Sequence, residues 1–179
     1  MSDVLAVADH RRGTLRDVSY ELVTAGRELA DAEGGDLHVA VVSGDVDRFA
    51  EQLDLDGVDA VHTVDYGEEF NHDVYAQAVE QLFAAVDPSV VLLPNSVNGL
   101  DYAPAIANSL SLPLVTDAIA VDADDGLEVT REMYGSKVET TIEVDADPVV
   151  LTVRGGEWPA AEAAGDAEVS AFDVDVDES

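Results

Sequence analysis

The segment from Asn95 to Asp101 carries the polar side chains best suited to binding a ligand in this sequence. Asn95, Ser96 and Asn98 could donate hydrogen bonds to a phosphate or a ribose, and the bare backbone of Gly99 would allow close approach. Asp101 could accept a hydrogen bond from a ribose hydroxyl. A structural interpretation stays open beside this one, in which Asn98 and Gly99 make a turn and Asp101 caps the next helix.

Other signals for catalysis are weak. The sequence has no cysteine, and its four histidines, at positions 10, 38, 62 and 72, show no metal-ligand spacing. Two common phosphate-binding loops, G-x-G-x-x-G after the first strand and G-x-x-x-x-G-K-[ST], are missing from the sequence. His10 follows the first expected strand, where it could contact a bound group, but a solvated loop histidine is the simpler expectation. We therefore expect neither a catalytic group nor a metal site.

Cations are scarce in this sequence, and three of the eight lie close together late in the chain. Arg131, Lys137 and Arg154 lie in or beside one expected hairpin, and Lys137 is the sole lysine. They could pair with an anion or a partner subunit, or they could offset neighbouring acids such as Glu132. Trp158, at the end of the last core strand, is expected to pack rather than to recognise a ligand.

The charge balance excludes some functions. With 39 acidic and 8 basic residues the formal net charge is −31, which makes nucleic acid an improbable partner. Because the acids are spread along the whole chain, they indicate a halophilic, acidic protein rather than a patch for one basic partner. Molar salt would shorten the Debye length to about 3 Å and screen this repulsion. No run of about 18 apolar residues and no secretory signal is present, so we expect a cytoplasmic protein without membrane insertion.

Alternating strand and helix patterns fill the first two thirds of the chain. Strands are expected at residues 3–9, 37–43, 60–64 and 90–93. Helices are expected to follow each of them: one capped by Thr14 and Asp17, one at 46–53, one that carries Tyr75, Leu82 and Val86, and one beginning near Asp101 with Pro104 in its first turn. Strands joined by helices of this length need crossover connections, which favours an α/β fold with a doubly wound, mostly parallel sheet.

The pattern changes after Pro113. Alternation with a period of two at residues 127–133 and 138–144 predicts a late antiparallel hairpin, and residues 149–153 return to a fully apolar strand. Beyond Gly155 the chain is rich in alanine and acids. We therefore expect one domain over residues 1–158 and an acidic linker or tail over residues 159–179.

Four segments together resemble the N-terminal domain of the electron-transfer flavoprotein alpha subunit. The stretch LLPNSVNGLDYAPAIANSLSLPLVTDAIAV, residues 92–121, is similar to the most recognisable part of that family, and VLAVADHRRGTLRDVSYELVTAGRELA is similar to its first strand and helix. TREMYGSKVETTI and PVVLTVRGGEW match its hairpin and last strand in order and spacing. Departures occur at residues 95–97, where small residues are usual, at Leu100, which replaces a frequent basic residue, and at Ser136, which replaces a second glycine.

The resemblance implies a Rossmann-like domain related to the adenine-nucleotide α-hydrolase fold. It also implies a heterodimer with a beta subunit that passes electrons from dehydrogenases through FAD, held mainly on a following domain, with AMP in the partner subunit as a further expectation. On this interpretation the chain is an electron-carrier subunit that lacks the C-terminal FAD-binding domain, through a trimmed boundary or a shorter gene product. The alternative is a stand-alone, stress-type domain that binds AMP or ATP through Asn95 to Asp101 and His10.

Overall fold

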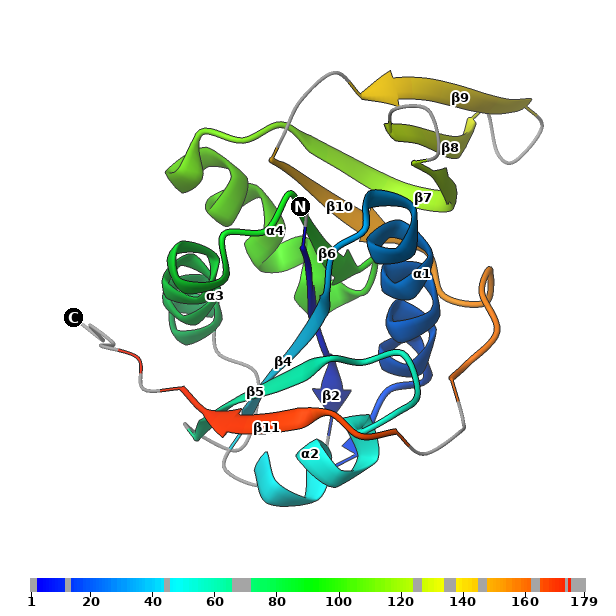
Figure 1. The fold of residues 1–179 in the computed structure, drawn as a ribbon. Helices are drawn as coiled ribbons and strands as arrows, with labels where there is room; N and C mark the ends of the chain where they lie inside the picture. The colour runs from blue at the N-terminus through cyan, green and yellow to red at the C-terminus, as the bar shows by residue number, and fades with distance from the viewer. Residues whose placement is uncertain are drawn as a thin grey trace.

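One twisted sheet with helices on both faces makes up most of the protein (Figure 1). The computed structural model describes residues 3–11, 14–43, 46–65, 72–123, 127–133, 138–144, 148–161, 165–172 and 174. Within these residues the helices are α1 (Asp17–Glu33), α2 (Val46–Leu53), α3 (His72–Val86) and α4 (Val97–Leu110). The main-sheet strands are β1 (Val4–Val7), β4 (Leu37–Ser43), β5 (Ala60–Asp65), β6 (Val90–Pro94), β7 (Leu114–Asp122), β8 (Leu127–Met133), β9 (Val138–Val144), β10 (Val149–Val153) and β11 (Glu168–Ala171). A separate short pair joins β2 (His10–Arg11) to β3 (Thr14–Leu15).

The strand order in the main sheet is β11-β5-β4-β1-β6-β10-β7-β8-β9. Pairings from β11 through β7 are all parallel, and β7, β8 and β9 are antiparallel to one another. The predicted α/β fold, with a mostly parallel sheet and a late hairpin, is confirmed. After β1 the chain moves to β4 and β5 on one side, and after β5 it returns to β6 on the other side of β1. The sheet therefore has a topological switch point between β1 and β6, where such folds usually bind ligands.

Fully apolar runs form the central strands because both faces of the sheet are covered. The VLAV, VVLLP and VVLTV segments of β1, β6 and β10 are buried at every position. Alternate residues of each strand enter two separate cores, one against α1 and α2 and the other against α3 and α4. Period-two geometry sends successive side chains to opposite faces, so an uninterrupted apolar run is what a doubly covered strand requires.

Two expected helix starts are wrong, and local hydrogen bonding explains both. Helix α1 begins after Arg16, which makes no side-chain cap bond, whereas Thr14 belongs to β3 and cannot cap the helix. Helix α4 begins at Val97 rather than near Asp101, because Ser96 is its N-cap. Pro104 is consequently inside the helix instead of in its first turn, on a solvent-exposed position where water can reach the neighbouring backbone.

Both edges of the sheet depart from the central parallel pattern. The β8–β9 hairpin projects beyond the helices at one edge, as Figure 1 shows. At the other edge, β11 pairs in parallel with β5 over Glu168 to Ala171, inside the segment expected to be a linker or tail. This part of the segment therefore belongs to the sheet. The alternating residues near the chain end could have indicated it, since Phe172 and Val174 pack against the core beside α3 and α4.

Candidate functional site

A cleft of about 630 Å³ opens at the carboxyl ends of the central strands. Three chain segments surround it: the one from β3 into α1, the β6–α4 turn, and the turn after β10. The residues that line it are Thr14, Leu15, Arg16, Asp17, Val18, Glu21, Asn95, Ser96, Gly155 and Gly156. Its volume lies within the range of about 300–1,000 Å³ that is typical of small-molecule sites. The cleft therefore lies where the topology places ligands in this kind of sheet.

The β6–α4 turn is held rigidly by its own backbone. The Gly99 N–H donates to Oγ of Ser96 at 3.2 Å, and the Leu100 N–H donates to the Ser96 carbonyl at 2.8 Å. A Cβ added at Gly99 would lie 1.9 Å from the carbonyl oxygen of Pro94, so only glycine fits against the end of β6. Gly99 is thus a packing requirement, and the Ser96 hydroxyl is already used within the turn.

A closed ring of side-chain hydrogen bonds ties the turn to β7 and β10. The Asp117 N–H donates to Oγ1 of Thr152 at 2.8 Å, and that hydroxyl donates to Oδ1 of Asn95 at 2.8 Å. Nδ2 of Asn95 then donates to Oδ1 of Asp117 at 3.1 Å. Asp117 has a left-handed backbone, with φ 62°, and the pairing register of β7 shifts beside it. Because aspartate tolerates this conformation better than most residues, the residue type suits the kink.

Arg154 joins this ring to the hairpin. Its Nε donates to Oδ1 of Asp117 at 2.8 Å and its Nη2 to Oδ2 at 2.5 Å, while Nη1 donates to Oε2 of Glu132 at 2.9 Å. The hydrogen bond from Arg154 holds the pKa of the Asp117 carboxyl below its usual range, and the same bonds raise the pKa of the guanidinium. Arg131 approaches from β8 and donates to the Thr116 carbonyl at 2.7 Å. We call Asn95, Asp117, Glu132, Thr152 and Arg154 the Asp117 network.

The opposite wall of the cleft is acidic. Glu21 of α1 is buried, and its Oε1 accepts the Gly156 N–H at 2.6 Å and the Trp158 N–H at 3.4 Å. The side chain of Arg16 is 44% exposed and lies 3.6 Å from the carboxylate of the buried Asp9. The described residues that line the cleft therefore include two carboxylates, Asp17 and Glu21, and one guanidinium, Arg16. This wall disfavours a ligand that carries several negative charges.

The structure brings together only part of the predicted site. Asn95 and Ser96 line the cleft, and Gly99 supports them from behind. Asp101 is exposed on α4 and is not among the residues that line the cleft, and it is not the helix cap, which is Ser96. The side chain of Asn98 lies outside the described residues.

Sequence reasoning missed most of the polar residues around the cleft. Asp17 and Glu21 were expected only as helix positions, and Asp117 lay in the stretch 92–121 that resembles the family but was not singled out as a site residue. One usable signal was Thr152, a single hydroxyl in the otherwise apolar run VVLTV. Arg154 pairs with the neighbouring acid Glu132, as expected if the late cations offset nearby acids. Lys137 lies outside the described residues. Trp158 packs against the core beside α1, as expected.

His10 is a core residue, so the expectation of a solvated loop histidine is wrong. It is 1% exposed, its ring stacks on Phe49, and its Nε2 lies 2.7 Å from the Val42 carbonyl oxygen. The hydroxyl of Tyr75 lies 2.9 Å from both that carbonyl and Nε2. The carbonyl of Val42 accepts, so the Nε2–H tautomer is the one that fits. His10 is therefore tied to β4 and α3 and does not line the cleft.

Comparison with known proteins places this architecture in a family. Residues 4–177 match the family described as the electron transfer flavoprotein domain. The chain is 38% identical to the electron transfer flavoprotein subunit alpha of Methylophilus methylotrophus, over 97% of this chain and 55% of that protein. It is 31% identical to the subunit of the same name from Thermoanaerobacterium thermosaccharolyticum, over 99% of this chain and 56% of that protein. The chain spans about half the length of these curated relatives. The family match covers the chain almost from end to end, and the chain has the mostly parallel sheet with a late hairpin described above. The chain therefore belongs to the electron transfer flavoprotein domain family.

Proposed function

We propose that the chain is the N-terminal domain of an electron transfer flavoprotein alpha subunit, and that it pairs with a beta subunit in an electron carrier. The observation that carries this proposal is the match to alpha subunits over 97% of the chain. In the assembled carrier, electrons would pass from dehydrogenases through FAD, whose chemistry is that of reversible hydride or single-electron uptake. This domain would supply orientation and partner recognition rather than catalysis.

The described residues that line the cleft do not fit FAD well, which supports placing the flavin outside this cleft. The Asn95 side chain is bonded at both its amide oxygen and its amide nitrogen, and the Ser96 hydroxyl caps α4. The pyrophosphate of FAD would also face Asp17 and Glu21, with Arg16 as the cation among the described lining residues. We therefore assign no electron-transfer step to residues of this cleft.

The hairpin edge is the surface that we assign to the beta subunit. Strand β9 is the last strand of the sheet, so the backbone along its outer side has no neighbouring strand among the described residues. Val138 on this strand is 46% exposed, and the paired strands β8 and β9 extend beyond the helices (Figure 1). Exposed apolar side chains on a protruding edge are typical of an interface. The Asp117 network anchors this hairpin to the sheet through Arg154 and Glu132.

Co-expression with a beta subunit in high salt, followed by sizing and a visible spectrum, tests the proposal. The wild-type chain should form a 1:1 complex with the beta subunit, and the visible spectrum reports whether that complex holds a flavin. A V138D variant should weaken the complex by roughly 10-fold, the size of effect expected for one interface anchor. V169D is the matched control, because Val169 on β11 is 49% exposed at the opposite edge of the sheet. Absence of a complex would refute the proposal, and equal loss from both variants would refute the assigned surface.

A second candidate function is binding of AMP or ATP by this domain alone. The position and volume of the cleft favour it, whereas its two carboxylates oppose a phosphate. Calorimetric titration with AMP separates the candidates, because micromolar binding that a change in the cleft lining abolishes would favour the nucleotide-binding function. A suitable change is R16Q, because Arg16 is the cation among the described lining residues and its side chain is 44% exposed.

A further inference from the structure

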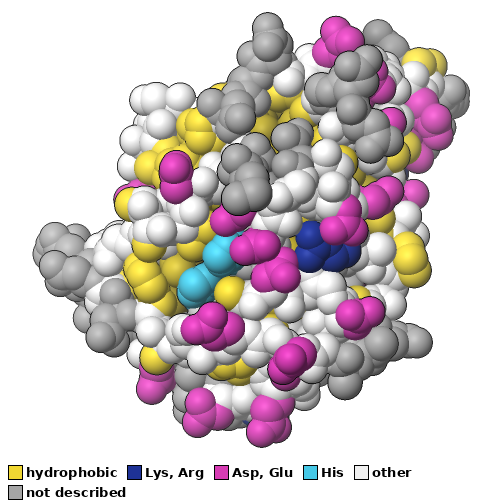
Figure 2. All heavy atoms as spheres, viewed as in Figure 1, with side chains coloured by type: hydrophobic (Ala, Val, Ile, Leu, Met, Phe, Trp, Pro, Cys, Tyr) yellow, Lys and Arg dark blue, Asp and Glu magenta, His cyan; other side chains and the backbone are white. Residues whose placement is uncertain are grey.

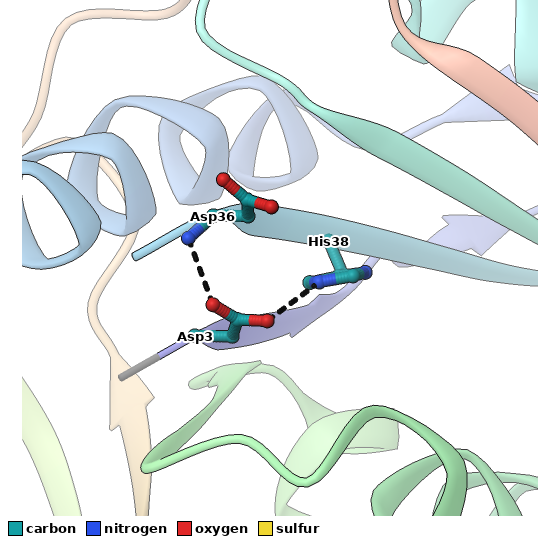
Figure 3. Close-up of side chains that lie close together, drawn as sticks. All are labelled: Asp3, Asp36 and His38. Carbon is teal, nitrogen blue, oxygen red and sulfur yellow. Dashed lines mark hydrogen bonds and ion pairs between the residues drawn. The ribbon is translucent and has the colours of Figure 1, made fainter. Parts of the chain in front are cut away.

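A second cluster of polar side chains lies at the amino-terminal ends of the strands, at the edge opposite the cleft. Figure 3 shows Asp3, the residue before β1, beside Asp36, the residue before β4, and His38 in β4. In the space-filling view, histidine side chains reach the surface near the centre of the face with carboxylates directly beside them (Figure 2). The histidine spacing in the sequence predicted no metal site, but it could not show this arrangement, because the partners come from different strands.

Strand register explains why these side chains share one face. Leu5 pairs with His38, and Ala40 pairs with His62 on β5. Because side chains alternate, Asp3 lies on the same face as Leu5, and Asp36 on the same face as His38. That face is the one covered by α3 and α4 further along the strands. The backbone around the cluster is fixed, since the Val4 N–H donates to the Asp36 carbonyl at 2.9 Å and the Ser89 N–H donates to the Asp3 carbonyl at 2.8 Å.

The three side chains offer one ligand atom each within a small volume. Oδ2 of Asp3 lies 3.1 Å from Nε2 of His38, and one ligand atom from each of Asp3, Asp36 and His38 lies within 4.8 Å of the others. Oδ1 of Asp3 accepts the Asp36 N–H at 2.9 Å, which fixes the orientation of that carboxylate. The side chains of Asp3 and His38 are 28% and 16% exposed. An imidazole nitrogen next to carboxylate oxygens, with open positions left for water, suits a divalent transition metal.

His62 occupies the place where metal-binding histidines elsewhere have a carboxylate, a backbone carbonyl or a water as outer partner. Its Nε2 lies 3.0 Å from Nδ1 of His38, and the two rings stack nearly parallel, with centroids 5.2 Å apart. A histidine that binds a metal through Nε2 carries its proton on Nδ1 and donates it to such a partner, which orients the ring. Phe172 lies edge-on to His62, with ring centroids 6.5 Å apart. The acceptor for Nδ1–H is therefore already in place.

We propose that Asp3, Asp36 and His38 bind one divalent transition-metal ion, with Zn²⁺ as its representative, and that His62 orients His38. This site is separate from the cleft and does not depend on the proposed electron-transfer function. In the metal-free chain the 3.1 Å contact is bridged by a proton on Nε2 of His38. When the metal takes Nε2, the proton of the neutral His38 ring moves to Nδ1 and is donated to Nε2 of His62. His62 accepts it by carrying its own proton on Nδ1 instead of Nε2, so both rings exchange tautomers and no net proton is gained or lost.

Titration of the tag-free 179-residue chain with Zn²⁺, in the presence of excess Mg²⁺ to occupy other carboxylates, tests this site. We expect one Zn²⁺ per chain, and at least roughly 10-fold weaker binding in D3N and H38Q. H62Q should weaken binding by about 10- to 100-fold, as loss of an outer partner does elsewhere. D56N is the matched control, because Asp56 is an exposed carboxylate on the segment between α2 and β5 and its change removes the same charge.

Nitrogen-15 NMR of the histidine rings in the unmodified chain keeps the test independent of whether the variants fold. Zn²⁺ should shift the Nε2 resonance of His38 and leave that of His10 unchanged. The proposal is overturned if no His38 ring nitrogen shifts at one equivalent of Zn²⁺. It is also overturned if folded D3N and H38Q bind Zn²⁺ as tightly as D56N does.

Discussion

Replacing Arg154 by methionine is the sharpest test of the Asp117 network. The change keeps most of the aliphatic stem and removes three charge-assisted hydrogen bonds, two to Asp117 and one to Glu132. The side chains of Arg154, Asp117 and Glu132 are 30%, 29% and 19% exposed, so solvent weakens each bond compared with a buried pair. Hydrogen bonds to charged groups contribute about 1.5–3 kcal/mol each when well formed. After allowance for screening we expect R154M to lower the free energy of unfolding by about 2 kcal/mol in total.

The loss should depend on pH in a defined direction. The folded-state pKa of Asp117 is lowered, chiefly by its hydrogen bonds from Arg154. Its contribution to stability is therefore complete above the ordinary aspartate pKa of about 3.9 and is lost as the pH falls through the lowered value. R154M removes the cause of that shift. The difference in stability between wild type and R154M should consequently be largest near pH 7 and should shrink in acid.

Urea unfolding followed by tryptophan fluorescence measures this effect without changing the ionic strength. Trp158 is the single tryptophan and is partly buried against the core near the end of β10. A loss of about 2 kcal/mol corresponds to a fall in Tm of about 4–8 °C for a domain of this size. R131M is the matched control, since Arg131 lies on the same hairpin but its hydrogen bonds go to the backbone and hydroxyl of Thr116. An unchanged urea midpoint in R154M at pH 7, or a loss that stays constant as the pH falls, would refute the reasoning.

Three further predictions concern packing, salt and the last strand. G99A should lower the free energy of unfolding by about 2 kcal/mol or more, because the added Cβ would lie 1.9 Å from the Pro94 carbonyl oxygen. G155A is the control and should change the free energy of unfolding little, since an added Cβ there would have its nearest neighbour at 3.8 Å. Raising KCl from about 0.1 to 1 M shortens the Debye length from about 10 to 3 Å and screens the repulsion in a chain with net charge −31. The urea midpoint in 1 M KCl should therefore be well above the midpoint in sucrose of equal osmolality. Equal midpoints in the two solutions would contradict the halophilic interpretation. Deleting residues 165–179 removes β11 and the packing of Phe172, and should cost about 2 kcal/mol of stability in urea unfolding; an unchanged midpoint would mean that β11 does not stabilise the sheet.

The positions of the central strands followed from apolar runs along the sequence. The VLAV and VVLLP segments contain no polar residue over a whole strand, and such runs are stable only where helices cover both faces of a sheet. The hairpin followed from the change to a period of two after Pro113. Helix starts were harder, because several polar residues compete for each cap. Ser96 and Asp101 were both acceptable caps for α4, and the choice depended on the backbone bonds that close the turn after Pro94.

The sequence alone therefore determined the fold class, the alternation of the central strands and helices, the late hairpin and the family, since these depend on local patterns that can be read along the chain. It also determined the large negative charge. It did not predict β7, the short β2–β3 pair or β11. Only the tertiary structure decided which side chains meet: Asn95 with Thr152, 57 residues away, Arg154 with Asp117, 37 residues away, and Asp3 with His38, 35 residues away. Each of these contacts depends on which strands become neighbours and in which register they pair. Strand neighbours and register are determined by the packing of the whole sheet, so they could not be predicted from a local sequence pattern.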